Sequence, residues 1–346
     1  MKLLQLQRFL QKEHINLAFF VHPDINITYL TQITASFSLL IVNKLSVKLY
    51  LSSLDKVPKI KNVKIEKLTK DWRKELTNNK VKKVGIDKGS ITVSFFEKLK
   101  KIYPKAKFID ISNKLKELRS LKTEQEIKKI KKACNITDKT FLAVLENLKK
   151  GKFKTEQQVS LFIENKIKQQ SAELAFPTIV ASGKNSAIPH HNTSSNKLKR
   201  GFLLFDFGAK YDNYCSDMSR TVFLGKPSKD EVEKYNLLLN VQKKALKEVK
   251  KGKLLLELEK NVRKNLDKFS SHFIHSLGHG VGIEIHEQPS FSHIDKQKIT
   301  LKQVFTIEPG VYFPNKYGIR IEDTVLFDGK LNILTKSSKE LIKIKI

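Results

Sequence analysis

The chain has 346 residues, of which 40% are hydrophobic and 29% are charged, a composition typical of a soluble globular protein with two domains. Lysine and arginine total 66 residues against 35 aspartates and glutamates, which gives a formal net charge of +31. Lysine supplies nearly all of this charge and is spread along the chain, whereas arginine, which reads phosphates and bases better, is rare. We therefore expect a solvated lysine-rich surface and no nucleic-acid partner.

The apolar runs and the cysteines bear on where the protein works. The first residues include Gln5 and Arg8, so they lack the apolar stretch of a secretory signal. Apolar runs such as residues 17–21 are far shorter than the roughly 20 residues of a membrane-spanning helix. Cys134 and Cys215 form no CxxC pair, which fits a reducing compartment and buried thiols. We expect a cytoplasmic protein without a membrane segment.

Residues 1–118 alternate short apolar runs with amphipathic lysine-rich stretches. The apolar runs have the length and composition of buried strands. They lie at residues 17–21, 38–42, 47–51 and 83–86. This alternation predicts a small α/β domain.

The pattern changes at residues 119–123, where we place the domain boundary. Thr123 and Glu126 have the spacing of a capping box, and apolar residues follow at helical spacing as far as Leu148. Further helix starts are predicted at Thr155 and Ser228. Strands are predicted at residues 176–181, 202–207, 214–223, 304–307 and 319–326. The second domain, residues 119–346, is therefore expected to be α+β with antiparallel strands.

Two acidic residues flank a predicted hairpin at residues 205–217. If this segment folds about Tyr211 and Asp212, Asp206 lies opposite Asp217, with their Cβ atoms about 5 Å apart. Two carboxylates so close repel unless one is protonated or a cation lies between them, and the flanking phenylalanines indicate poor solvation. A divalent metal would relieve the repulsion, whereas a slipped register or two solvent-facing acids would remove it.

The same arrangement recurs at residues 306–323. Folding about a turn centred on Asn315 places Glu308 opposite Glu322, and Pro309 is expected to distort the start of the hairpin. Two opposed acid pairs in a chain with few acids favour a carboxylate-rich site that binds cations over two solvent-exposed pairs.

Histidines are concentrated between these hairpins. Three of the nine lie within twelve residues: His275, His279 and His286. The glycines between them argue against a helix, so the HExxH motif of zinc proteases is excluded. Histidines here would supply the imidazole ligand and the proton-transfer groups that a carboxylate-rich dinuclear site lacks. His190 is a fourth candidate, whereas its neighbour His191 is expected at the surface.

Together these motifs resemble the creatinase-like "pita-bread" metallopeptidases, in particular the Xaa-Pro aminopeptidase and Xaa-Pro dipeptidase branch. The resemblance implies a creatinase-like N-terminal domain, residues 1–118, and a pita-bread catalytic domain, residues 119–346, with a dinuclear metal site. The segments NITYLT at 26–31 and LRSLKT at 118–123 look like that family's N-terminal domain and the start of its catalytic helix, and they are less specific motifs. The specific motifs are DFGAKYDNYCSDMSRT at 206–221, HSLGHGVGIEIHE at 275–287, TIEPGVY at 306–312 and GIRIEDT at 318–324.

The resemblance also implies a ligand set for two divalent metal ions. Asp206 would bind one ion, Asp217 and Glu322 would bridge both, and His279 with Glu308 would hold the second. The family usually takes manganese or cobalt, and an oxygen-rich shell with a single histidine is compatible with manganese. Zinc and iron stay open.

The implied reaction is hydrolysis of an Xaa-Pro bond by water that the metal ions activate. Glu308 would transfer the proton, and His286 would stabilise the developing oxyanion. His275 and His190 would line the substrate pocket. Arg320 would hold the bridging glutamate in place.

Several functions are compatible with these motifs. The main expectation is an Xaa-Pro aminopeptidase, a homodimer that acts on peptides with proline at the second position. The alternative is an Xaa-Pro dipeptidase, or prolidase. A methionine aminopeptidase shares the catalytic domain, but the extra N-terminal domain disfavours it. A non-catalytic module that binds peptides, histones or RNA would usually have lost the metal ligands, which are all retained here.

Overall fold

The computed structural model describes residues 2–69, 72, 76, 80–291 and 296–345. The chain forms two compact units, Met1–Arg119 and Ser120–Ile346. The division lies one residue beyond the boundary predicted after residue 118. Among the described residues, no helix combines the length and the apolar character needed to cross a bilayer.

The first unit is built on a six-stranded sheet in the order β4-β3-β2-β1-β5-β6. Its strands are β1 (Leu17–Val21), β2 (Ser38–Asn43), β3 (Val47–Leu51), β4 (Lys64–Lys67), β5 (Lys83–Ile86) and β6 (Lys107–Asp110). The helices that lie wholly within the described residues are α1 (Lys2–Lys12), α2 (Ile25–Thr31), α4 (Val93–Ile102) and α5 (Ser112–Ser120). Strands β1, β2 and β3 pair antiparallel, and the other pairs are parallel. The predicted α/β character is confirmed, and the four predicted apolar runs are β1, β2, β3 and β5.

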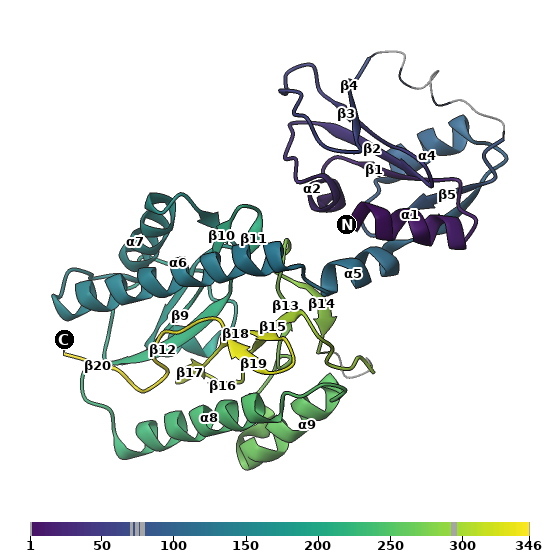
Figure 1. The fold of residues 1–346 in the computed structure, drawn as a ribbon. Helices are drawn as coiled ribbons and strands as arrows, with labels where there is room; N and C mark the ends of the chain where they lie inside the picture. Colours follow the sequence, from purple (N-terminus) through teal and green to yellow (C-terminus); the bar gives the residue numbers. More distant parts are fainter. Residues whose placement is uncertain (1, 70–71, 73–75, 77–79, 292–295, 346) are drawn as a thin grey trace. The chain divides into compact units, whose positions relative to one another are not determined.

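The second unit combines long helices with several small sheets (Figure 1). The helices are α6 (Glu124–Lys149), α7 (Glu156–Gln169), α8 (Lys229–Glu248) and α9 (Leu255–Leu266), with short 3-10 helices η1 (Gly183–Ala187) and η2 (Asp267–His272). The strands up to α8 are β7 (Glu173–Leu174), β8 (Ile179–Ser182), β9 (Gly201–Phe207), β10 (Ala209–Tyr211), β11 (Tyr214–Cys215) and β12 (Met218–Leu224). Those that follow are β13 (His279–Gly280), β14 (Glu287–Ser290), β15 (Gln303–Ile307), β16 (Gly310–Phe313), β17 (Tyr317–Arg320), β18 (Asp323–Phe327), β19 (Leu331–Ile333) and β20 (Lys343–Ile344).

Two hydrophobic cores lie on opposite faces of these sheets. Helices α6 and α7 cover one face, and α8 and α9 cover the other (Figure 1). The alternation along β9 shows the division, because Phe205 packs edge-to-face on Phe141 of α6 whereas Phe202 stacks on Tyr235 of α8. The capping box predicted at Thr123 is present. The strands in the middle layer are therefore held rigidly from both sides.

The predicted strands 214–223 and 319–326 are each interrupted once. The first breaks between β11 and β12 at Asp217, and the second between β17 and β18 at Glu322. At both breaks the backbone N–H turns to another partner: that of Asp217 donates to Thr324 Oγ1 at 3.2 Å, and that of Glu322 to the Ser219 carbonyl at 3.2 Å. The prediction of continuous strands was wrong at these points because the two acidic residues leave their ladders.

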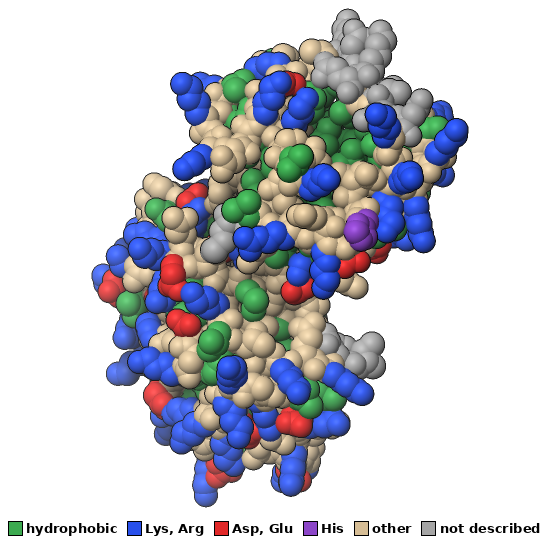
Figure 2. Space-filling model, turned by 45° about the vertical axis from the view of Figure 1, so that its right-hand side comes forward, with side chains coloured by type: hydrophobic (Ala, Val, Ile, Leu, Met, Phe, Trp, Pro, Cys, Tyr) green, Lys and Arg blue, Asp and Glu red, His purple; other side chains and the backbone are tan. Residues whose placement is uncertain are grey.

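Positive charge is dispersed over the surface. Figure 2 shows lysine and arginine side chains across one face of the molecule, with acidic side chains among them. Some exposed charged residues form ion pairs one helical turn apart, such as Glu97 with Lys100 in α4 at 2.6 Å. Pairs of this kind typically contribute less than about 1 kcal/mol. The buried cores, and not the surface charges, therefore supply most of the stability.

Gly208 sits at the junction of β9 and β10, immediately after the strand that carries Asp206. A Cβ atom at this position would lie 1.9 Å from the Ser216 carbonyl oxygen, which is backbone and cannot rotate away. We expect Gly208→Ala to destabilise the second unit by roughly 1–3 kcal/mol, measured by urea unfolding. Gly89→Ala is the control, because its nearest neighbour is a side-chain oxygen of Asp87 at 3.2 Å. Equal stability of the Gly208 variant and the wild type would contradict this account.

Candidate metal centre and active site

One cavity of about 470 Å³ in the second unit is lined by all nine predicted site residues. They are His190, Asp206, Asp217, His275, His279, His286, Glu308, Arg320 and Glu322. The volume is in the usual range for a small-molecule site. Apolar side chains form part of the wall, among them Phe176, Pro177 and Ile285. The fold therefore gathers segments that are far apart in the sequence around one polar cavity with an apolar side.

The first acidic pair is brought together in a different register from the predicted one. Asp206 lies opposite Ser219, not opposite Asp217. The reason is the turn, which consists of Asp212 and Asn213, both with positive φ, as a two-residue hairpin turn of this kind requires. The prediction had centred the turn one residue too early. Asp217 is two positions from Ser219, and residues two apart on a strand lie on the same face of the sheet. Asp206 and Asp217 are therefore diagonal neighbours on the face that borders the cavity.

The second acidic pair has the predicted register. Gly310 pairs with Arg320, and the ladder between β15 and β18 continues the same register on the other side of the gap. Glu308 and Glu322 lie in that gap, where the chain departs from regular pairing at Pro309, as predicted. The Glu308 N–H donates instead to the Leu277 carbonyl at 2.9 Å, which ties the glutamate to the histidine-rich segment.

His279 points its free nitrogen at the carboxylates. Its Nδ1 lies 3.1 Å from the carbonyl oxygen of Gly280. A carbonyl oxygen can only accept a hydrogen bond, so Nδ1 carries the proton. Nε2 then presents a lone pair 3.4 Å from Asp217 Oδ2 and 3.5 Å from Glu308 Oε1. Ligand atoms of Asp217, His279 and Glu322 all lie within 4.8 Å of one another. An imidazole fixed in this tautomer is oriented as a metal-ligating histidine usually is.

The buried carboxylates are incompletely satisfied by the protein. Burial, followed by repulsion from Asp206 and Glu308, raises the pKa of Asp217 well above its ordinary value. Burial and the charge of Asp217 likewise raise the pKa of Glu322. Asp206 Oδ1, Asp217 Oδ1 and Glu322 Oε1 are buried without a hydrogen-bond partner among the described residues. Unpartnered anionic oxygens around one imidazole fit a divalent cation in both charge and ligand type.

Arg320 contacts a different carboxylate from the one predicted. The guanidinium is 4% exposed and donates to Asp206 Oδ2 at 2.5 Å, whereas the hydrogen bonds described for Arg320 include none to the Glu322 carboxylate. Its link to Glu322 is indirect, because Arg320 Nε donates to Ser219 Oγ at 2.8 Å and that hydroxyl donates to Glu322 Oε2 at 2.7 Å. The prediction overlooked that Ser219, two residues after Asp217, shares its face of the strand.

Tyr312 is a site residue that the sequence reading missed. Its hydroxyl accepts from Arg320 at 2.6 Å and lies 3.0 Å from His275 Nε2. His275 Nδ1 in turn donates to the Ser276 carbonyl at 2.8 Å, so both ring nitrogens are engaged. Burial lowers the pKa of His275 and raises that of Tyr312 to about 12, which keeps both neutral near pH 7. The signal was available, because the second hairpin's register makes Tyr312 a diagonal neighbour of Arg320.

The remaining histidines differ in their surroundings. The ring of His286 lies 4.2 Å from that of His279, and burial together with this neighbour lowers the pKa of His286. His190 is exposed at the cavity wall. The surface prediction for His191 was wrong: its side chain is 10% exposed and its Nε2 bonds to the buried Glu156 carboxylate at 2.9 Å. The Glu156 carboxylate lies 35 residues earlier in the sequence, so no local pattern indicated that contact.

Comparisons with known proteins agree with the architecture. The family model of metallopeptidase family M24 matches residues 128–328, and that of the creatinase/prolidase N-terminal domain matches residues 2–121. The chain is 36% identical to an Xaa-Pro dipeptidase of Pyrococcus furiosus over 99% of both sequences. It is similar to the crystal structure of the prolidase from Pyrococcus horikoshii OT3, with a TM-score of 0.89 and 34% identity over 99% of both chains. An X-Pro aminopeptidase from Thermotoga maritima gives a TM-score of 0.88 and 30% identity over 96% of this chain and 98% of that one. The predicted pita-bread fold is thereby confirmed.

The raised pKa of Glu322 predicts an unusual pH dependence for the metal-free protein. A carboxyl group with a raised folded pKa contributes stability that is present below its unfolded pKa and is lost as the pH rises through the folded value. Glu322→Gln removes the ionising group, so we expect it to raise the melting temperature at pH 8 in a chelator by roughly 2–4 °C, about 1 kcal/mol, and less at pH 5. The matched control is Glu124→Gln, an exposed glutamate paired with Lys302. A lower melting temperature for Glu322→Gln at pH 8 would show that the ionised Glu322 carboxylate does not destabilise the metal-free protein.

Proposed function

This chain belongs to metallopeptidase family M24 and carries the creatinase/prolidase N-terminal domain, and on that basis we propose that it is an Xaa-Pro dipeptidase. The proposal reverses the order of the two sequence-based readings, which put the Xaa-Pro aminopeptidase first. The relatives support the reversal, because two Pyrococcus proteins that are similar to this chain over most of its length are named Xaa-Pro dipeptidase. The observation that carries the catalytic reading is the set of unpartnered carboxylate oxygens around His279.

We assign the metal ligands as the resemblance implies. Asp206 would hold one ion, Asp217 and Glu322 would bridge two, and His279 with Glu308 would hold the other. The donor set supports this, because carboxylate oxygens with one imidazole suit a manganese pair, with cobalt or zinc as alternatives. Bound divalent ions would supply Lewis acidity, which activates water and polarises the scissile carbonyl.

Side chains of the protein would transfer the proton and stabilise the oxyanion. Glu308 lies beside the His279 imidazole, and Thr306 Oγ1 donates to its Oε1 at 3.2 Å, which fixes the carboxylate for receiving a proton and passing it on. His286 is neutral near pH 7 because burial lowers its pKa. A neutral imidazole can donate one hydrogen bond to the developing oxyanion without repelling cations.

Arg320, Tyr312 and His275 act as positioning groups in this proposal. Arg320 fixes Asp206 directly and Glu322 through Ser219. Because both nitrogens of His275 are bonded to protein, we reassign it from a substrate contact to a support for Tyr312.

The substrate lies, in this proposal, between the polar floor and the apolar wall. Phe176, Pro177 and Ile285 give a non-polar surface suited to a proline ring, and the exposed His190 faces the same space. A homodimer and a cytoplasmic location stay predictions of the sequence analysis.

The substrate class is tested by comparing an Xaa-Pro dipeptide with the matching Xaa-Pro-Yaa tripeptide on manganese-loaded protein. We expect the dipeptide to have a kcat/KM at least about tenfold higher, since ~1.4 kcal/mol of differential transition-state binding suffices for that ratio. An Xaa-Ala dipeptide is the control for the proline requirement. Preference for the tripeptide would return the assignment to an Xaa-Pro aminopeptidase.

The role of His286 is tested by separating rate from metal content. We expect His286→Ala to lower kcat by roughly 10²–10³-fold, as for loss of an oxyanion donor, while bound metal measured by atomic emission stays at the wild-type level. His272→Ala serves as a control, because His272 packs on Phe313 outside the cavity lining. Loss of metal in parallel with activity would make His286 a ligand instead.

A further inference from the structure

Two buried charged residues stand directly behind the proposed metal centre. Arg220 follows Ser219 in β12, and Asp323 follows Glu322 at the start of β18. Since successive side chains in extended backbone point to opposite sides, these two point away from the cavity, and neither lines it. Arg220 is 1% exposed and Asp323 is fully buried. Burying both charges is costly unless they meet, and Arg220 Nη2 lies 2.8 Å from Asp323 Oδ1.

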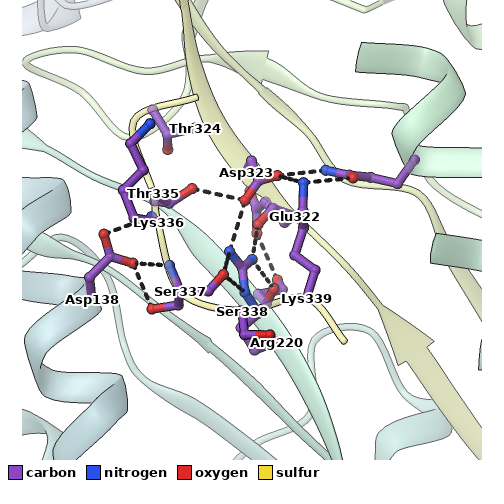
Figure 3. Close-up of polar contacts among 12 residues, drawn as sticks. Asp138, Arg220, Glu322, Asp323, Thr324, Thr335, Lys336, Ser337, Ser338 and Lys339 are labelled. Atoms are coloured by element: carbon purple, nitrogen blue, oxygen red, sulfur yellow. Dashed lines mark hydrogen bonds and ion pairs between the residues drawn. The ribbon is translucent and has the colours of Figure 1, made fainter. Parts of the chain in front are cut away.

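The guanidinium of Arg220 bonds to backbone carbonyl groups of separate segments (Figure 3). Its Nη1 donates to the Ser219 carbonyl at 2.9 Å and also to the Glu322 carbonyl. Nη2 and Nε donate to the Ser337 carbonyl at 2.9 and 3.2 Å. One planar side chain therefore joins the strand of Ser219, the residue Glu322 and the C-terminal segment, which a lysine with its single nitrogen cannot do.

Asp323 completes the same network from the other side. It accepts from Arg220, from Thr335 Oγ1 at 3.0 Å, from Gln242 Nε2 of α8 at 2.8 Å and from Lys339 Nζ at 2.5 Å. All of its acceptor capacity is used, so its orientation is fixed. The backbone of Glu322, one residue earlier, is fixed with it.

The C-terminal segment, residues 335–339, closes this network and is itself tied to α6. The Asp138 carboxylate accepts from the N–H groups of Lys336 and Ser337 at 2.8 Å each and from Ser337 Oγ at 2.6 Å (Figure 3). Helix α6, helix α8 and the two ligand-bearing strands thus meet at one buried cluster. Nothing in the proposed chemistry uses these groups.

We propose that Arg220 and Asp323, with the C-terminal segment 335–339, are positioning residues that hold Glu322 and Ser219 in the geometry required for metal binding. The proposal rests on the metal centre assigned above. Glu322 sits at a break between strands, where no regular ladder holds its backbone. The contacts from Arg220 and Ser219 replace that ladder, so the C-terminal segment contributes to the metal centre and does more than cover the core.

The test measures Mn²⁺ affinity by titration calorimetry on the full chain after chelation, which needs no peptide substrate. Arg220→Lys keeps the charge but loses the planar set of donors. We expect it to weaken Mn²⁺ binding tenfold or more while circular dichroism shows a folded protein, in line with other changes behind metal ligands. A smaller change in a folded Arg220→Lys variant would overturn the proposal.

Tyr235→Phe is the matched control, because it removes a hydrogen bond to the end of the same segment and keeps every hydrogen bond of Arg220 and Asp323. The buried Tyr235 hydroxyl donates its hydrogen bond to the Lys339 carbonyl at 2.8 Å, and not to Asp323. It should lower the melting temperature in chelator and leave Mn²⁺ affinity within twofold of the wild type. A tenfold loss of affinity in this control would mean that general loosening, and not the Arg220 contacts, governs the site.

If Arg220→Lys does not fold, Thr335→Val decides the matter, because it removes a single hydrogen bond to Asp323. We expect it to weaken Mn²⁺ binding about threefold, the effect of part of one hydrogen bond, and unchanged affinity would overturn the proposal. Wild-type protein that binds no Mn²⁺ would instead refute the metal centre, so the two failures are distinguishable.

Discussion

The structure depends on one constraint: several acidic side chains lie close together where little water reaches them. Asp206, Asp217, Glu308 and Glu322 border one cavity, and burial with mutual repulsion raises the pKa of two of them. A fold that only needed stability would not gather these groups, since apolar residues of similar size would cost less. Their arrangement is understandable if cations supply the missing positive charge. Arg320 supplies part of it permanently, on Asp206.

The two-sided architecture explains how such a cluster is kept from spreading apart. Helices α6 and α7 press on one face of the central strands, and α8 and α9 on the other, so the strands cannot relax by bending. The acids themselves occupy places where regular pairing stops, at Asp217, Glu308 and Glu322. Hydroxyl groups replace the missing ladder bonds: Thr324 holds Asp217, Ser219 holds Glu322, and Thr306 holds both the His279 N–H and Glu308.

Membership of the M24 family and the geometry of the cavity answer different parts of the functional question. The family establishes a metallopeptidase, and divalent metal ions with it. The choice between dipeptides and longer peptides depends on what surrounds the open side of the cavity, and the ligand residues are compatible with either. Our proposal of a dipeptidase therefore rests on the names of relatives such as the Xaa-Pro dipeptidase of Pyrococcus furiosus, and the proposed proline contact with the apolar wall is the same for both substrate classes.

The sequence by itself determined the fold class and named the candidate residues that the fold brings to one cavity, because strand periodicity and motif spacing are local properties. It placed β3 and β5, the capping box at Thr123 and the register of the Glu308 hairpin. It misplaced the turn at Asp212 and Asn213 by one residue, because turn type depends on backbone angles that many residue pairs can adopt.

Only the tertiary structure decided which groups satisfy one another. Arg320 bonds to Asp206 and not to Glu322, and His191 is held by Glu156. Arg220 and Asp323 bond to a segment, residues 335–339, that lies beyond the last motif. Such contacts join residues that are remote along the chain, and they follow from packing in three dimensions, which no local pattern encodes.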